Sequence, residues 1–219
     1  MQVNGLMGGV YKISVWITKF AYLNLLWILF TLFGLIIFGF FPASVSTFAV
    51  VRKWLKCKGE FSLFHFFFSY YKKEFIKSNL LGIILLGIAF ILYVDMKFIL
   101  QNHTGFWGVV SSITVLAIIL FIFMVLYVFP VYVTYQISVI KIIQNSFLYM
   151  FVNPKVTFIM IAALITLFLG GMYFPGATFI FGGSLYSFCI MWYADQAFVH
   201  VQQKKIHHRN SLSKDLSNN

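Results

Sequence analysis

The sequence predicts an all-α protein: a multi-pass transmembrane helical bundle of about five spans, with amphipathic interfacial helices beside the spans. Two observations predict this class. Of the 219 residues, 61% are hydrophobic and only 10% are charged, whereas a water-soluble domain needs about 25% charged residues to cover its surface. The apolar residues also gather in long runs that match a bilayer-crossing helix of about 20 residues. Lipid is therefore the expected solvent for most of the chain.

Five apolar segments are long enough to cross a membrane. They lie at about 21–41, 80–100, 106–129, 156–173 and 177–198. A count of six is the alternative, in which residues 13–51 form a tight hairpin of two short spans and the N-terminus is cytoplasmic. Residues 8–19 could form either an interfacial helix or the start of a span, because two lysines that flank apolar residues are compatible with both.

The distribution of lysine and arginine predicts the orientation. With five spans, thirteen of the 16 basic residues lie in the 42–79 loop, the 130–155 loop and the C-terminal tail, and three lie on the other side. Cytoplasmic loops of membrane proteins carry the excess of basic residues. The C-terminus is therefore expected in the cytoplasm and the N-terminus outside. The basic tail, residues 204–219, is rich in Ser, Asn and Lys and is predicted to be disordered.

The net charge of +11 suggests particular partners. An excess of basic over acidic residues usually suggests binding to nucleic acid. Here the basic residues occur in short runs between apolar spans, where contact with anionic phospholipid explains them more simply. We therefore predict contact with anionic phospholipid and no binding of nucleic acid. The residues predicted to contact the membrane surface or a partner are Arg52, Lys53, Lys56, Lys58, Phe64, Phe68, Lys72, Lys73 and Lys77.

Two Phe-Pro pairs follow apolar runs and end at Pro42 and Pro130. Proline cannot continue the helical hydrogen-bond ladder, so both are predicted as structural corners where a span ends and an interfacial helix begins. At an offset of 88 residues the two segments share five identities in sixteen positions. This predicts a weak parallel repeat within a single transmembrane domain at 1–203, with repeat-like units at about 20–100 and 106–174.

Three polar residues within the apolar segments are candidates for a role inside the membrane: Asn24, Asp95 and Asp195. Ionisable groups in a span are functional candidates because their burial in hydrocarbon is costly. The two acids are expected near opposite faces of the membrane, so a structural role is favoured over a proton relay. Asn24 is interpreted as an interhelical hydrogen-bond partner.

Catalytic and metal-binding patterns are missing from the sequence. The five histidines are scattered without an HExxH motif, and the two cysteines, Cys57 and Cys189, have no metal-ligand spacing. A P-loop is also missing, so the chain cannot energise transport by itself. We therefore predict no enzymatic activity, no cofactor and no metal.

Three blocks of the sequence, in order, resemble one protein family. They are YLNLLWILFTLFGLIIFGFFPASVSTFAVVRKW, YYKKEFIKSNLLGIILLGIAFILYVD and YVFPVYVTYQISVIKIIQNSFLYMFVNPKVT. Over about residues 5–200 the chain is similar to the YesL family, a bacterial integral-membrane group defined as a domain of unknown function. The resemblance implies a multi-pass protein of the cell membrane, typical of Gram-positive bacteria, whose genes often lie beside those for carbohydrate uptake and breakdown. It implies no set of catalytic residues.

Two classes of function follow. The resemblance favours an accessory or regulatory component of carbohydrate uptake, with a sugar ABC transporter as the partner. The alternative is an independent small-molecule or lipid-interacting membrane carrier. Few polar residues line the spans, which argues against a hydrophilic sugar pathway through this chain alone. The sequence predicts no particular oligomeric state.

Overall fold

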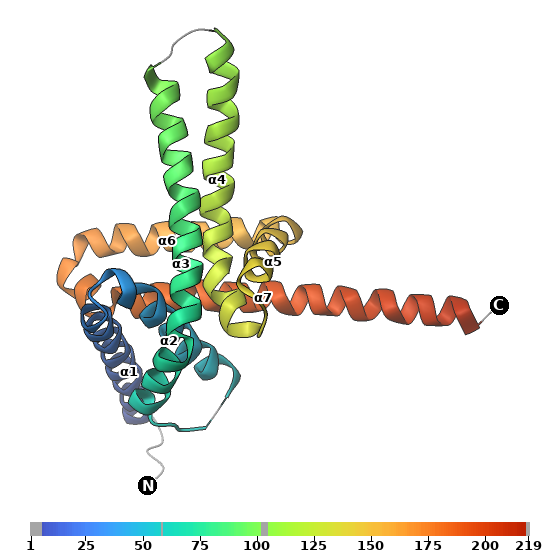
Figure 1. Cartoon of the computed structure of the whole chain (residues 1–219). Helices are drawn as coiled ribbons and strands as arrows, with labels where there is room; N and C mark the ends of the chain where they lie inside the picture. Colours follow the sequence, from blue (N-terminus) through green and yellow to red (C-terminus); the bar gives the residue numbers. More distant parts are fainter. Residues whose placement is uncertain (1–5, 58, 102–104, 218–219) are drawn as a thin grey trace. The chain divides into compact units, whose positions relative to one another are not determined.

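The computed structural model describes residues 6–57, 59–101 and 105–217, and this part of the chain is helical apart from short connections (Figure 1). No β-strand occurs in these three stretches, which confirms the all-α class. The helices are α1 (Leu6–Phe33), α2 (Ile37–Lys56), α3 (Leu63–Gln101), α4 (Gly105–Thr134), α5 (Val139–Val152), α6 (Pro154–Tyr173) and α7 (Pro175–Ser217).

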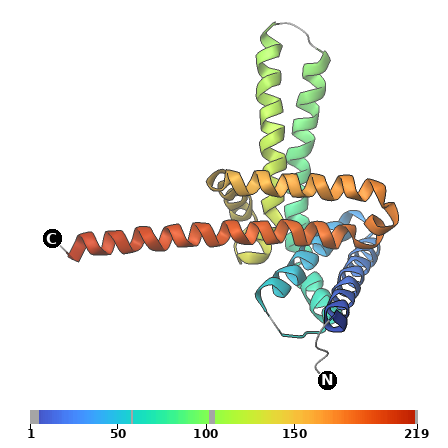
Figure 2. The ribbon, with the colours of Figure 1, turned by 180° about the vertical axis from the view of Figure 1, so that it is seen from behind.

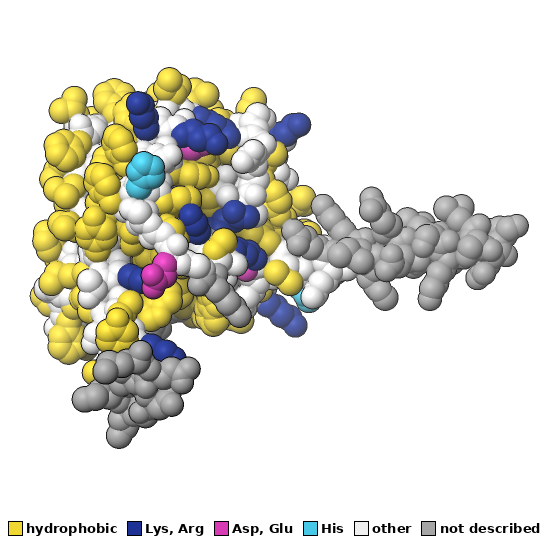
Figure 3. Space-filling model, turned by 90° about the horizontal axis from the view of Figure 1, so that it is seen from below, with side chains coloured by type: hydrophobic (Ala, Val, Ile, Leu, Met, Phe, Trp, Pro, Cys, Tyr) yellow, Lys and Arg dark blue, Asp and Glu magenta, His cyan; other side chains and the backbone are white. Residues whose placement is uncertain are grey.

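Five of these helices are long and apolar enough to cross a membrane, as predicted. The candidate spans are Gly9–Phe33, Leu63–Ile99, Val110–Thr134, Pro154–Tyr173 and Pro175–Val201. Many large apolar side chains on them are exposed, and Figure 3 shows hydrophobic side chains over much of one face. Such a surface is stable only if lipid covers it. The last three spans lie close to their predicted positions, whereas the first differs.

The chain forms two compact units. Unit 1 contains Met1–Ala89 and Leu164–Cys189, and unit 2 contains Phe90–Ala163 and Ile190–Asn219. The helices α3, α6 and α7 therefore contribute to both units. The predicted parallel repeat stays a prediction.

In unit 1, α1 and α2 form an antiparallel hairpin. The Trp27 indole N–H donates to the Ser44 hydroxyl at 3.1 Å, and the ring centroids of Trp16 and Trp54 are 5.6 Å apart. The predicted span at 21–41 is therefore wrong, because α1 ends at Phe33 and the chain then reverses. Residues 8–19 belong to α1, and a hairpin within 13–51 is the arrangement found.

The reversal of the chain is unusually tight. Leu35 and Ile36 have φ angles of 57° and 65°, and the Ile37 N–H donates to the Leu35 carbonyl at 2.7 Å. A hydrogen bond over two residues with a positive φ at the central residue is a γ-turn, a rare and strained conformation. None of these residues is charged or proline, which is why the sequence reads as one continuous span.

Helix α2 is buried, so the prediction of an interfacial helix after residue 42 is wrong. Every residue from Pro42 to Val51 is buried. Small side chains allow neighbouring helices to approach all faces of a helix in a membrane protein. The hydroxyls of Ser46 and Thr47 donate to carbonyls of their own helix, those of Pro42 and Ala43, so the buried polar atoms are satisfied.

The predicted corner at Pro42 is also wrong, because this proline lies inside α2. Proline lacks the N–H that would bond the carbonyl four residues earlier, that of Phe38. The Asn79 side-chain amide in α3 donates to this carbonyl at 3.0 Å. A side chain from a neighbouring helix therefore replaces the missing donor, and the helix continues.

The corner at Pro130 is wrong for the same reason. Pro130 lies inside α4, which continues to Thr134, and the Tyr135 N–H still donates to the Val131 carbonyl at 2.9 Å. Pro42 therefore follows a reversal of the chain, whereas Pro130 precedes the break between α4 and α5. The two Phe-Pro pairs do not occupy equivalent places.

The C-terminal tail also differs from its prediction. Instead of a disordered segment at 204–219, α7 continues to Ser217 as one unbroken helix (Figure 2). The sequence after Gly183 contains neither glycine nor proline, and an established helix extends at little cost.

The core of unit 2 is formed around tyrosines. The Tyr127 hydroxyl of α4 and the Thr157 hydroxyl of α6 share a hydrogen bond at 2.8 Å. In α5, Tyr149 bonds the Tyr135 hydroxyl and packs on Phe198 of α7 with ring centroids 4.6 Å apart. Burial, with a smaller contribution from the Tyr135 hydrogen bond, raises the pKa of Tyr149.

Candidate functional site

Basic residues of α1 and of the end of α2 meet at one end of the hairpin. We call this the basic end, formed by the first half of α1, the end of α2, residues 57–62 and the start of α3. The Lys19 ammonium lies 5.5 Å from the Trp16 ring, and Trp16 contacts Trp54 at the end of α2. Because α1 and α2 are antiparallel, Lys19 lies at the same end as Arg52 and its neighbours. The three basic residues predicted on the other side of the membrane from the 42–79 loop include Lys19, so the place of Lys19 beside Trp16 and Trp54 contradicts that prediction.

Lys53 is held by aromatic rings. Its ammonium lies 4.1 Å from the ring centroids of both Phe61 and Phe66. A cation over an aromatic face gains about 0.5–1 kcal/mol at an exposed site. These two contacts connect the end of α2 to the connection that follows it and to the first turn of α3.

Arg52, next to Lys53, is half-buried. Its Nε is buried and has no hydrogen-bond partner among the described residues. Tyr70 lies within electrostatic range of both Arg52 and Glu74. A buried guanidinium nitrogen without an acceptor is an unusual feature that a partner group could satisfy.

The aromatic stripe at the start of α3 has a buried side and an exposed edge. Phe67 and Tyr71 are buried, whereas Phe64 and Phe68 are 48% and 44% exposed. The Phe30 ring of α1 packs against all four of these rings. Helix packing therefore explains the stripe, and its edge remains accessible.

The other predicted contact residues differ in exposure. Lys56, Lys72 and Lys73 are exposed and Lys77 is half-buried. Lys58 lies outside the described residues.

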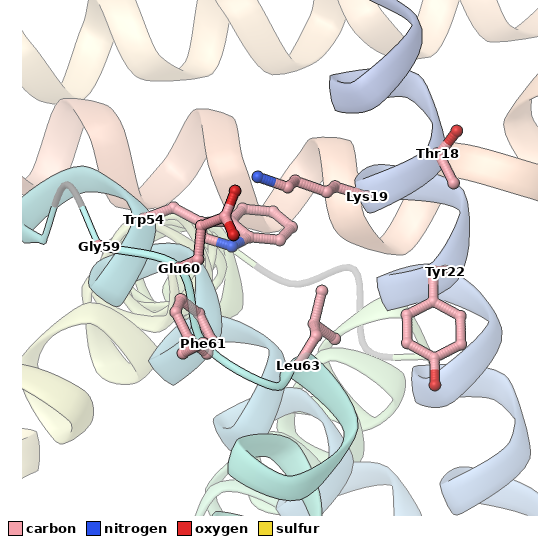
Figure 4. Close-up of a pocket in the computed structure, with 8 residues that line it drawn as sticks. All are labelled: Thr18, Lys19, Tyr22, Trp54, Gly59, Glu60, Phe61 and Leu63. Atoms are coloured by element: carbon pink, nitrogen blue, oxygen red, sulfur yellow. The ribbon is translucent and has the colours of Figure 1, made fainter.

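A cavity of about 350 Å³ lies at the basic end (Figure 4). Its lining includes a cation, an acid and an indole, those of Lys19, Glu60 and Trp54. Figure 4 shows the Lys19 side chain extending toward the other two. None of these three residues is among the predicted site residues, because only the hairpin alternative for 13–51 brings Lys19 to this end.

Asn24 makes the interhelical hydrogen bond expected of it. Its side-chain amide donates to the Phe179 carbonyl of α7 at 2.8 Å. Its Oδ1 is buried, has no hydrogen-bond partner in the described structure and lies where a side chain at Gly183 would be. The absence of a side chain at Gly183 therefore lets α1 and α7 approach closely.

The two acids lie in unit 2. Asp95 is exposed on α3, and Asp195 is half-buried on α7, where it lines a cavity with Trp192 and His200. The described residues contain no group of three His, Cys, Asp or Glu side chains that could hold a metal ion. Cys57 and Cys189 are free thiols.

Comparison with known proteins gives the family of the chain. Residues 20–96 match the family model described as "Protein of unknown function, DUF624". The "Uncharacterized protein YesL" of Bacillus subtilis (strain 168) is 32% identical over 205 residues, which are 94% of this chain and 97% of that protein. The chain belongs to the YesL family.

Two further similar proteins also come from Bacillus subtilis (strain 168). The "Uncharacterized protein YteU" is 35% identical over 203 residues, covering 93% of this chain and 91% of that protein. The "Uncharacterized protein YesV" is 33% identical over 195 residues, covering 88% and 92%. No solved structure is significantly similar to the chain. In this YesL-family chain, the matched residues 20–96 include all of α2 and the start of α3, and with them most of the basic end.

Proposed function

We propose that this YesL-family chain is a non-catalytic accessory or regulatory component of carbohydrate uptake, and that it binds a sugar ABC transporter in the bacterial cell membrane. The family resemblance supports the carbohydrate link. The observation that carries the docking role is the exposed edge of α3, where Phe64 and Phe68 lie beside the exposed Lys72 and Lys73.

The two phenylalanines form a preorganised contact surface. Their rings are 6.1 Å apart and nearly parallel, with an interplanar angle of 8°. Rigid aromatic groups bordered by charged side chains are typical of protein interfaces, because they bury apolar area at little cost in side-chain entropy. The Phe30 ring of α1 packs against both rings and restricts their movement.

Two cavities of unit 1 favour an accessory role over a carrier that moves hydrophilic molecules through them. Hydrophilic ligands require several polar groups that converge on one site. The cavity between α6 and α7 is lined mainly by Leu, Phe and Gly residues, with two threonines and a tyrosine. The cavity beside Trp16 is lined by Ile, Phe and Leu residues, with one lysine. Both cavities are mainly apolar and suit an apolar ligand better than a sugar.

We further propose that both termini are cytoplasmic. The antiparallel hairpin supports this orientation, because it returns the chain to the side from which α1 starts. With α3, α4, α6 and α7 crossing the membrane, Lys97 alone among the 16 basic residues then lies on the outer side. This distribution of basic residues follows the positive-inside rule more closely than the distribution that an external N-terminus would give.

The hairpin is proposed to enter the membrane without crossing it. Its turn lies beside α3, since the Tyr71 hydroxyl donates to the Phe30 carbonyl and Asn79 donates to the Phe38 carbonyl. The turn is therefore level with the charged segment 72–77 of α3. A hairpin that crossed the membrane would place these lysines in hydrocarbon, at about 2.5–3.5 kcal/mol each.

Single-cysteine labelling in intact cells tests the orientation after Cys57 and Cys189 are replaced. An impermeant thiol reagent should label Asn102→Cys and should leave Gly9→Cys and Ser213→Cys unlabelled until the cells are opened. External labelling of Gly9→Cys would contradict a cytoplasmic N-terminus.

Affinity purification tests the docking role. The tagged chain, extracted in a mild detergent, should co-elute with permease subunits of a sugar ABC transporter. The double variant Phe64→Ala/Phe68→Ala should lose this co-elution, whereas Phe90→Ala, which removes another exposed ring of α3, should retain it. Co-elution that survives the double variant would show that this edge is not the docking surface.

A further inference from the structure

Two cavities of unit 1 adjoin each other along α1. The first is the cavity at the basic end, and the second has a volume of about 360 Å³. Thr18 and Tyr22 line both. The second cavity extends along α1 as far as Ile28, which is about 15 Å from Thr18 at a rise of 1.5 Å per residue. A single elongated ligand could therefore occupy both.

The two cavities differ in chemistry. The first presents the Lys19 ammonium, the Glu60 carboxylate and the Trp54 indole. The second is lined mainly by apolar side chains, among them Leu25 and Ile28 of α1 and Phe179 and Ile180 of α7. The one amide in its lining, that of Asn24, is already bonded to Phe179. A ligand that fits both has a polar, charged end and a hydrocarbon tail.

The charges at the first cavity narrow the choice of ligand. A site for an anion alone would not include a carboxylate, and a site for a cation alone would not include a lysine. A phosphate bonds well to an ammonium donor, and an organic ammonium binds a carboxylate and the face of an indole. The lining therefore suits a group that carries a phosphate and an ammonium a few atoms apart.

We propose that α1 binds a zwitterionic aminophospholipid of the phosphatidylethanolamine class. Lys19 contacts the phosphate, Glu60 and Trp54 contact the ethanolamine ammonium, and one acyl chain lies along α1 between Thr18 and Ile28. This site differs from the predicted contact with anionic phospholipid through Arg52 and the neighbouring lysines. It does not depend on the proposed role in carbohydrate uptake.

Lipid titration of the full chain in detergent micelles tests the site, with native mass spectrometry to count bound lipids. Phosphatidylethanolamine should bind more tightly than phosphatidylglycerol, which has the phosphate but lacks the ammonium. Lys19→Met should weaken the binding of phosphatidylethanolamine about tenfold, as expected for loss of a charge-assisted contact. Lys12→Met, which removes another α1 lysine that does not line this cavity, is the matched control and should change nothing.

Glu60→Gln separates this proposal from general attraction to anionic lipid. It should weaken the binding of phosphatidylethanolamine while leaving that of phosphatidylglycerol unchanged or stronger. Equal binding of the two lipids to the wild-type chain, or an equal effect of Glu60→Gln on both, would overturn the proposal.

Ala21→Phe tests the apolar part, because it places a ring in the second cavity. It should weaken the binding of the diacyl lipid. Glycerophosphoethanolamine, the same headgroup without acyl chains, should bind only weakly to any variant. If it competes as well as the lipid does, the acyl groove has no role. Thermal unfolding of each variant identifies any loss of fold.

Discussion

The closeness of α1 and α2 at the turn of the hairpin gives a sharp prediction for Gly39→Ala. A Cβ atom at position 39 would lie 2.7 Å from the Phe30 carbonyl oxygen and even closer to that of Thr31. Both contacts are to the backbone of α1, so no side-chain rotation can relieve them. The added methyl group must push the two helices apart.

The cost can be estimated from overpacked cores. Extra methyl groups in a tightly packed site destabilise proteins by about 1–3 kcal/mol. The displacement would also strain the Trp27–Ser44 hydrogen bond, which is worth up to about 1.5 kcal/mol. Against this, alanine in a helix is about 1 kcal/mol more favourable than glycine. We therefore expect a net loss of about 1–3 kcal/mol in the free energy of unfolding.

Thermal unfolding in one detergent, followed by tryptophan fluorescence, measures the effect. Gly87→Ala is the matched control, because Gly87 lies within α3 and a Cβ atom there would meet nothing within 4 Å. It should be neutral or slightly stabilising. If Gly39→Ala were as stable as Gly87→Ala, the two helices could not approach as closely as described.

Three further predictions concern single side chains. Ile36→Gly should stabilise the chain by about 1 kcal/mol, because it relieves strain of about 1–3 kcal/mol and the greater freedom of glycine in the unfolded chain offsets only about 0.5–1 kcal/mol of this gain. Ile37→Gly, inside α2, should destabilise it. Because the pKa of Tyr149 is raised in the folded chain, the unfolded chain loses the phenol proton at a lower pH, and the free energy of unfolding should fall above about pH 10. Unfolding midpoints measured at pH 8–11 should fall less steeply for Tyr149→Phe than for the wild-type chain. Lys53→Met should lower the unfolding free energy by about 0.5–1 kcal/mol, measured by thermal unfolding, whereas Lys72→Met should not.

The sequence predicts the helical class and the five candidate spans because lipid selects for average hydropathy over long segments. The first hairpin could not be located in this way. Its turn contains Gly34, Leu35 and Ile36, which are as apolar as the flanking helices, so no change in composition marks the reversal. The hydroxyls and small residues of 43–49 were a signal that this segment packs inside the protein, but they resemble an interfacial segment when burial is unknown.

The candidate site shows the same limit of sequence reasoning. Arg52 and Lys53 stand out as a charge run in the sequence. Lys19 and Glu60, which line one cavity, are 41 positions apart and have no shared motif. Only the direction of α2 relative to α1 brings them together, and that direction depends on the turn at residues 34–36.

A hairpin that enters the bilayer from one side and stops short has a mechanical consequence. Its turn is level with residues 72–77 of α3, so only the exposed apolar side chains of residues 35–38 reach the hydrocarbon. In the proposed orientation the hairpin takes up lateral area mainly in the cytoplasmic leaflet, and the protein is then a wedge that favours a convex cytoplasmic surface. In a cell whose membrane is concave on that side, such a wedge is least strained where the membrane is flattest. We therefore expect a fluorescently tagged chain to be depleted from strongly curved cell poles, and a replacement of residues 34–36 that straightens the hairpin should abolish this depletion.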